Sequence, residues 1–158
     1  MIISEENIKA MQKSAAQYPY VKSAILPCLT IAYRQEGYLY DELYHEIAEI
    51  IGVSPNEVAS AASFYTMFPK HKVGKYLIQV CINISCGLLG AESLVEYLLK
   101  KLEINLGEIT EDGLFTVVEV ECLGSCSSAP MMQINQDYYE NLTKEKVDQI
   151  LEDLRKQG

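Results

Sequence analysis

The sequence predicts an α+β or α/β protein in which an N-terminal helical bundle precedes a small α/β domain. Up to about residue 68, apolar side chains recur at helical spacing between clear start and stop signals. After the Pro69–Lys72 segment, β-rich stretches alternate with amphipathic helical stretches. These two patterns predict a helical bundle over residues 1–72 and an α/β domain over residues 73–158.

The first two helices are predicted from their capping and stop residues. Ser4 can cap a helix with two glutamates in its first turn, and Tyr18-Pro19 ends it, since the residue before a proline avoids helical backbone. A second helix is expected from Ser23, with Pro27 in or near its first turn, where a missing N–H costs little. Gly37 is its expected C-terminal stop.

The next two helices have equally clear signals. One is expected from Asp41 to a stop at Gly52. The Ser54–Glu57 segment is a capping box with a proline at the first helical position, so a fourth helix starts there. We expect it to continue through Phe68 and to be broken by Pro69.

The second domain is predicted as strand, helix, strand, strand, strand and helix. A strand, a crossover helix and a second strand form a right-handed parallel unit, and a hairpin with a closing helix completes a small sheet. This order is compatible with a thioredoxin-like fold. The expected strands are residues 75–81, 115–121, 130–135 and 138–140, the helices are residues 91–102 and a last one capped by Thr143, and residues 82–89 are expected to form a loop.

The composition excludes several classes of partner. The chain of 158 residues carries a formal net charge of -9. Nucleic acid and anionic lipid both require a basic surface, so neither is an expected partner. No apolar run approaches the ~18 residues of a membrane-spanning helix. Residues Met1–Glu6 lack the features of a signal peptide, and the expected compartment is the cytoplasm.

Four of the five cysteines form two close pairs, each placed directly after a predicted strand. Four residues separate Cys81 from Cys86, and three separate Cys122 from Cys126. In a parallel α/β sheet the loops that follow the strands gather along one edge. If the two strands are neighbours, the four thiols converge there.

Four converging thiols in a cytosolic protein indicate a metal centre or a redox group. A [2Fe–2S] cluster takes four thiolates, and a four-residue gap also occurs in plant-type ferredoxins. The N–H and O–H groups of nearby residues could donate hydrogen bonds to sulfur, namely Gly87, Gly90, Gly124, Ser125, Ser127 and Ser128. A structural zinc site usually has two residues between paired cysteines, although up to four occur. A zinc-stabilised interaction module without a redox role, and a thiol sensor joining Cys81 to Cys86, therefore remain as alternatives.

The other candidate residues have simpler interpretations. Cys28 lies on an apolar helical stripe, which favours a buried core thiol over a fifth ligand. His45 and His71 are isolated in the sequence and are expected to face solvent. No Gly-x-Gly-x-x-Gly motif is present, so no dinucleotide site is expected in this chain.

With its two cysteine pairs about 35 residues apart, the chain resembles the 24 kDa subunit family of NADH:quinone oxidoreductase (respiratory complex I). The likeness extends from about Tyr18 to Leu154. It is carried by the cysteine motif and by the segments Phe64–Phe68, Val73–Tyr76, Glu121–Cys126, Ser128–Pro130 and Tyr138–Thr143.

The resemblance implies a helical bundle followed by a thioredoxin-like [2Fe–2S] ferredoxin domain. Its cluster ligands would be Cys81, Cys86, Cys122 and Cys126, and Pro130 would follow a cis peptide bond. The Ile82–Ser85 loop is more apolar than is usual in the family, which can shift the cluster's potential but leaves ligation undisturbed.

The resemblance also implies a role in electron transfer. The subunit would exchange single electrons with a partner that carries flavin and oxidises NADH, within a complex that holds further iron–sulfur subunits. FMN and NAD would bind only to the partner, and this chain alone would catalyse nothing. It would be cytoplasmic or peripheral to the inner membrane through the complex. Soluble NAD-linked hydrogenases, including electron-bifurcating ones, and formate dehydrogenases use the same module and remain as alternatives.

Overall fold

The computed structural model describes residues 1–157, which group into two compact units. The first unit spans Met1–Lys72, and the second begins at Val73. Each unit has its own hydrophobic core, formed by residues between Ile3 and Phe68 in the first and between Tyr76 and Leu154 in the second. Among residues 1–157 there is no helix with the length and apolar character needed to span a bilayer.

The first unit contains the four predicted helices. The Ser4 hydroxyl accepts a hydrogen bond from the Asn7 N–H at 3.3 Å, as expected of a cap. Gly37 and Gly52 end their helices in the left-handed conformation, with φ of 80° and 75°. The helices are α1 (Glu5–Ala15), α2 (Ile25–Glu36), α3 (Asp41–Ile51) and α4 (Pro55–Phe64).

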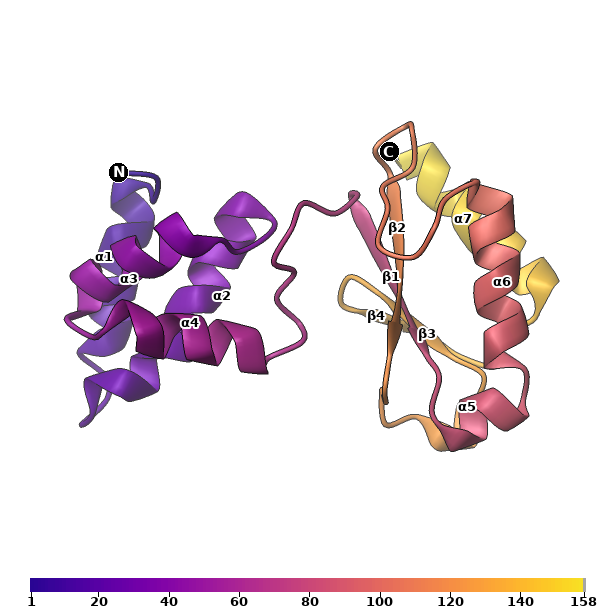
Figure 1. The fold of residues 1–158 in the computed structure, drawn as a ribbon, viewed down its shortest axis with the longest axis horizontal. Helices are drawn as coiled ribbons and strands as arrows, with labels where there is room; N and C mark the ends of the chain where they lie inside the picture. Colours follow the sequence, from indigo (N-terminus) through magenta and orange to yellow (C-terminus); the bar gives the residue numbers. More distant parts are fainter. Residues whose placement is uncertain (158) are drawn as a thin grey trace. The chain divides into compact units, whose positions relative to one another are not determined.

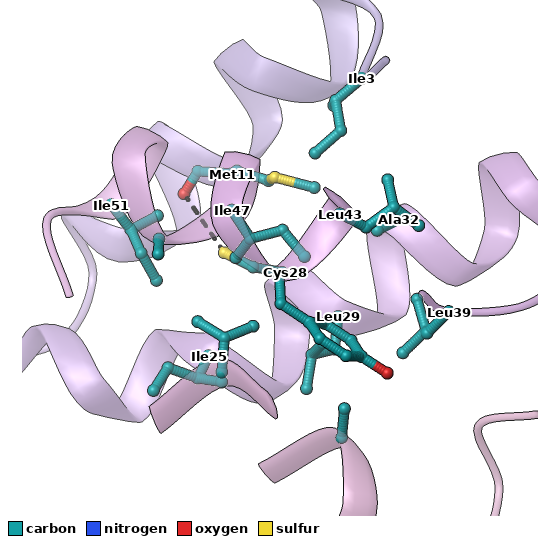
Figure 2. Packing of buried hydrophobic residues seen from close by; sticks show 14 of the residues in the cluster. Ile3, Met11, Ile25, Cys28, Leu29, Ala32, Leu39, Leu43, Ile47 and Ile51 are labelled. Atoms are coloured by element: carbon teal, nitrogen blue, oxygen red, sulfur yellow. Dashed lines mark hydrogen bonds between the residues drawn. The ribbon is translucent and has the colours of Figure 1, made fainter. Parts of the chain in front are cut away.

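Cys28 is a core thiol, as its position on an apolar stripe predicts. It is fully buried, and Figure 2 shows its sulfur directed at the Met11 carbonyl oxygen, 4.0 Å away, with Ile47 beside it. Aliphatic side chains, together with the rings of Tyr44 and Phe68, fill the rest of this core. Cys28 therefore contributes to packing in the first unit.

Three helix ends differ from the expectation. α1 ends at Ala15 instead of at Tyr18. α2 begins at Ile25 instead of Ser23, because a 3₁₀ turn (Val21–Ala24, η1) precedes it. α4 ends at Phe64 instead of Phe68, and the following residue is extended. Phe64 is 78% exposed whereas Phe68 is 2% exposed. Residues four apart share a helix face, so a continued helix could not bury Phe68, and the chain unwinds to place it against Tyr33.

The second unit is a four-stranded sheet with strand order β2-β1-β3-β4. β1 pairs with β2 in parallel, as predicted, and with β3 antiparallel, while β3 and β4 form an antiparallel hairpin. The strands are β1 (Tyr76–Cys81), β2 (Phe115–Val120), β3 (Met132–Ile134) and β4 (Asp137–Tyr139).

Two helices, α6 (Ala91–Leu102) and α7 (Lys144–Gln157), lie side by side on one face of this sheet (Figure 1). The Tyr97 hydroxyl on α6 donates to the Asp148 carboxylate on α7 at 2.6 Å. The Thr143 hydroxyl accepts from the Lys146 N–H at 3.2 Å and so caps α7 as predicted. The apolar sides of both helices complete the second core.

The segment expected to be a loop after β1 contains a short helix, α5 (Ile84–Leu88), and the loop prediction is wrong there. Asn83 caps this helix, because its side-chain oxygen accepts from the Ile84 N–H at 2.9 Å. The Asn83 amide also donates to the Glu121 carbonyl at 2.8 Å. Asn83 therefore links the start of α5 to the end of β2.

The segment before β3 matches the expectation for its proline, although the strand begins at Met132 instead of Pro130. The Ala129–Pro130 peptide bond is cis, as the resemblance implies. A short 3₁₀ turn, η2 (Cys126–Ser128), precedes it.

Candidate metal centre

The two cysteine pairs lie at one edge of the sheet because their strands are parallel neighbours. Cys81 is the last residue of β1 and is in register with Val120, the last residue of β2. The Ile82 N–H donates to the Val120 carbonyl at 3.0 Å, which carries the pairing one residue beyond the strands. Cys122 follows two residues after Val120. The geometric expectation from the sequence is therefore met at the level of the backbone.

The thiols of the two loops influence each other. Cys86 and Cys122 both act to lower the pKa of the Cys81 thiol. Cys126 lies near enough to Cys86 to influence its ionisation. Cys81 and Cys86 are buried beside Met131, whereas Cys122 and Cys126 are exposed. The loops that carry the four cysteines singled out by the spacing therefore lie at one edge of the sheet, with one buried pair and one exposed pair.

The Cys81 thiol is biased towards the thiolate. Burial acts to raise its pKa, but the N–H groups of Asn83 and Leu123, together with the thiols of Cys86 and Cys122, outweigh burial and lower the pKa. One of these donors belongs to its own loop and the other to the opposite loop. Cys81 is therefore held at the point where the two loops meet.

Cys86 behaves in the opposite way. Burial raises its pKa, and the hydrogen bond with Cys81 and the charges of Cys81 and Cys126 raise it further, against a lowering by the Met131 N–H. Crowded thiols of this kind cannot all ionise without a cation to balance them. A metal centre provides that positive charge.

Backbone N–H groups in the second loop point at sulfur. The Gly124 N–H donates to the Cys122 Sγ at 3.4 Å, and the Leu123 N–H donates to Cys81. Gly124 has a φ of 77°, in the left-handed region that favours glycine. This turn directs two successive N–H groups to two different cysteines.

The hydroxyls of Ser125 and Ser128 do not point at sulfur, and that expectation is wrong. Both donate to the carboxylate of Glu140, Ser128 at 2.6 Å, and their oxygens lie 2.8 Å apart. The Glu140 carboxylate is a better acceptor because it is charged. The sequence analysis did not predict this role for Glu140. It pointed to Glu140 only as part of the Tyr138–Thr143 segment, which carries the family resemblance.

The donor set fits a binuclear iron–sulfur cluster. Thiolates are the ligands of such clusters, and N–H donors to sulfur stabilise their added negative charge. Within residues 1–157, no three histidine, cysteine or carboxylate side chains are grouped as ligands of a single metal ion. A [2Fe–2S] cluster does not need such a group, because its four thiolates are divided between two iron atoms, two on each.

The remaining candidates belong to the first unit. Cys28 and both histidines precede Val73, where the second unit begins. His45 and His71 are exposed, as predicted. None of the three has a place among the four converging thiols.

Comparison with known proteins identifies the family. The profile of the thioredoxin-like [2Fe–2S] ferredoxins matches residues 11–155. This chain belongs to that family. As a member it holds one [2Fe–2S] cluster, and the fold described above is the family's fold.

Two bacterial relatives are subunits of one kind of enzyme. The chain is 43% identical to an NADH-quinone oxidoreductase subunit of Rhizobium meliloti (strain 1021), covering 92% of this chain and 86% of the relative. It is also 43% identical to NADH-quinone oxidoreductase subunit 2 of Thermus thermophilus, covering 92% of this chain and 82% of that one. The chain is therefore similar over most of its length to subunits of NADH-quinone oxidoreductases.

A solved structure extends the likeness to a second kind of enzyme. The air-oxidized NAD+-reducing [NiFe]-hydrogenase is 25% identical with a TM-score of 0.71, over 84% of this chain. This chain spans only 23% of that hydrogenase chain. The same fold thus occurs as one part of a longer redox protein.

Proposed function

We propose that this chain is the electron-transfer subunit of an NADH-dependent oxidoreductase of the complex I type. Its single [2Fe–2S] cluster would exchange one electron at a time with a partner subunit. The observation that carries the proposal is the convergence of two cysteine pairs at one sheet edge in a member of a ferredoxin family. The relatives are named as subunits of NADH-quinone oxidoreductases, and we infer the type of complex from those names.

We assign Cys81, Cys86, Cys122 and Cys126 as the cluster ligands. The mutual effect of their thiols on ionisation and the N–H groups of Leu123 and Gly124 support this assignment. When bound, the cluster supplies a one-electron redox couple. The chain itself holds the thiolates, directs N–H donors at sulfur and buries the Cys81 side of the site.

The partner should carry a flavin. NADH delivers two electrons as a hydride, whereas a [2Fe–2S] cluster accepts one, so a flavin must separate the pair. No Gly-x-Gly-x-x-Gly motif offers a dinucleotide site here. FMN and NAD therefore belong to the partner subunit, with further iron–sulfur subunits in the same complex.

A second assembly is supported by the structural likeness to the NAD+-reducing [NiFe]-hydrogenase. In such an enzyme the chain would keep the same role, and only the final electron acceptor or donor would differ. Purification of the tagged chain from its own cells, followed by mass spectrometry, separates the two. Quinone-reductase subunits would support the first assembly, and hydrogenase subunits would support the second.

Ligand assignment is tested by changing each cysteine separately to serine. The reconstituted wild-type chain should be brown, bleach with dithionite and contain iron and acid-labile sulfide in equal amounts. Each of the four ligand variants should lose most of its iron or change its electron paramagnetic resonance spectrum. Cys28→Ala is the matched control and should keep the wild-type spectrum. A colourless wild-type protein with one zinc ion per chain would reject the proposal.

Catalytic dependence on the partner is tested with the purified chain alone. It should show no NADH–dye reductase activity, because the hydride acceptor is on another subunit. Addition of the flavin subunit should restore reduction of the cluster by NADH. Activity that persists in the isolated, flavin-free chain would contradict this division of roles.

A further inference from the structure

One peptide group connects a tyrosine to a proposed cluster ligand. The Tyr138 hydroxyl donates to the Leu123 carbonyl at 2.8 Å. That carbonyl belongs to the same peptide unit as the Gly124 N–H, which donates to the Cys122 Sγ at 3.4 Å. A hydrogen bond at one end of a peptide polarises it and strengthens donation at the other end. Tyr138 therefore acts on the Cys122 sulfur through this peptide.

A second side chain from the same strand region holds the other end of the loop. Alternate residues of a strand share a face, so Tyr138 and Glu140 can reach the loop while Tyr139 packs against the core of the unit. The Glu140 carboxylate accepts from Ser125 and Ser128, on either side of Cys126. The hydrogen bonds from both serines lower the pKa of Glu140, which keeps it charged at neutral pH.

The backbone around these side chains is fixed. β4 pairs with β3, and β3 pairs with β1, the strand that ends at Cys81. The Asn141 N–H donates to the Ser128 carbonyl at 2.7 Å, and the Leu142 N–H donates to the Pro130 carbonyl at 3.0 Å. The loop that carries Cys122 and Cys126 is therefore anchored to a paired hairpin.

We propose that Tyr138 and Glu140 are positioning residues that set the reduction potential of the cluster. Tyr138 acts through the Leu123–Gly124 peptide, and Glu140 acts through Ser125, Ser128 and its own negative charge. This inference rests on the proposed ligand assignment. Its physical basis is that hydrogen bonds to ligand sulfur and nearby charge both tune iron–sulfur potentials.

The two residues should act in opposite directions. Donation from the Gly124 N–H stabilises the extra negative charge of the reduced cluster, so weakening it should lower the potential. The Glu140 carboxylate repels that same charge, so neutralising it should raise the potential. A purely structural role for the pair would not produce shifts of opposite sign.

The first test is Tyr138→Phe, which removes the hydroxyl and keeps the ring. Tyr138 is half exposed, so the fold should tolerate the change. At fixed ambient potential, the ratio of reduced to oxidised cluster should fall about two- to fivefold. This range corresponds to a fraction of the net free energy of one hydrogen bond. Tyr97→Phe is the matched control, since Tyr97 bonds to Asp148 on α7 and not to the loop. Potentials are measured by redox titration followed by electron paramagnetic resonance.

The second test is Glu140→Gln, which removes the charge but keeps an oxygen for the serine hydroxyls. The reduced fraction should rise about two- to fivefold at low salt. The difference from wild type should shrink at high salt, because ions screen a charge that is only partly buried. The shift caused by Tyr138→Phe should not depend on salt. Glu108→Gln is the control, because Glu108 bonds only within its own turn, to Asn105.

The outcomes separate this inference from the ligand assignment. If the wild-type chain holds no [2Fe–2S] cluster, both fail. If it holds the cluster but the two variants titrate like wild type, only the positioning role is overturned. Shifts of the same sign in both variants would also reject it. Thermal unfolding of each variant confirms that the fold is intact and that the comparison is valid.

Discussion

Cys28 and Cys81 are both buried thiols, yet their surroundings give them opposite chemical character. Burial raises the pKa of Cys28 to about 11, because no donor compensates for the loss of water. At Cys81 burial also acts to raise the pKa, but two N–H donors and two thiols outweigh it. Burial alone therefore does not bias a thiol towards the thiolate, whereas directed donors at the end of a strand do.

The raised pKa of Cys28 predicts a loss of stability in alkali. Its folded pKa of about 11 exceeds the usual 9.0, so the stabilising contribution is complete below pH 9 and disappears as pH rises through 11. Cys28→Ala should lack this decline. The difference in free energy of unfolding between wild type and Cys28→Ala should therefore change by up to roughly 2 kcal/mol between pH 8 and pH 11. Denaturant titrations at pH 8 and pH 11 measure it.

The control for this prediction is Met11→Leu, a change of similar volume in the same core that removes no titratable group. It should keep the wild-type dependence on alkaline pH. An equal alkaline decline in wild type and Cys28→Ala would show that Cys28 does not titrate in this range.

Helix ends in this protein are decided by burial as well as by local signals. Where a cap was strong, as at Ser4, the predicted start is correct. The end of α4 was misplaced because Pro69 is the nearest obvious breaker, although the chain leaves the helix after Phe64. The free energy gained by burying Phe68 exceeds that of one more helical turn on the surface.

The burial of Phe68 and the exposure of Phe64 predict contrasting effects when each ring is truncated. Phe68→Ala removes a ring that is 2% exposed and should lower the free energy of unfolding by about 3–5 kcal/mol. Phe64→Ala removes a ring that is 78% exposed and should change it by less than about 0.5 kcal/mol. Thermal or denaturant unfolding compares them, and equal losses would refute the account of the helix end.

At the scale of the whole molecule, residues 1–157 form two units, each with a main core of its own. The first joins residues between Ile3 and Phe68, and the second joins residues between Tyr76 and Leu154. The proposed cluster ligands all lie in the second unit. A unit with its own core can fold by itself, so the ability to bind the cluster should belong to the second unit alone.

A chain beginning at Val73 should therefore assemble the cluster without the helical bundle. Its iron content and electron paramagnetic resonance spectrum should match those of the full chain. The same fragment with Cys81→Ser is the control, and should lose iron or change its spectrum as the full-length variant does. A fragment that stays unfolded or colourless would show that the first unit is needed for the second to fold.

The sequence alone determined the order of the elements and the cysteine pairs. These follow from local rules, namely caps, periodicity and the spacing of residues in a loop. The parallel pairing of β1 with β2, predicted from the crossover helix, was enough to place both cysteine pairs at one edge. The Asn83 cap is a sequence signal for α5, but the helix is too short to show a helical repeat of apolar residues.

Only the tertiary structure decided what surrounds the thiols. The link from Tyr138 to Leu123 and the link from Glu140 to Ser125 join residues 15 positions apart, and both depend on where the β3–β4 hairpin lies. Local sequence sets which hydrogen-bonding groups exist, but the folded sheet decides which of them meet. The sequence therefore determines that four thiols converge, and the fold determines which donors and charges act on them.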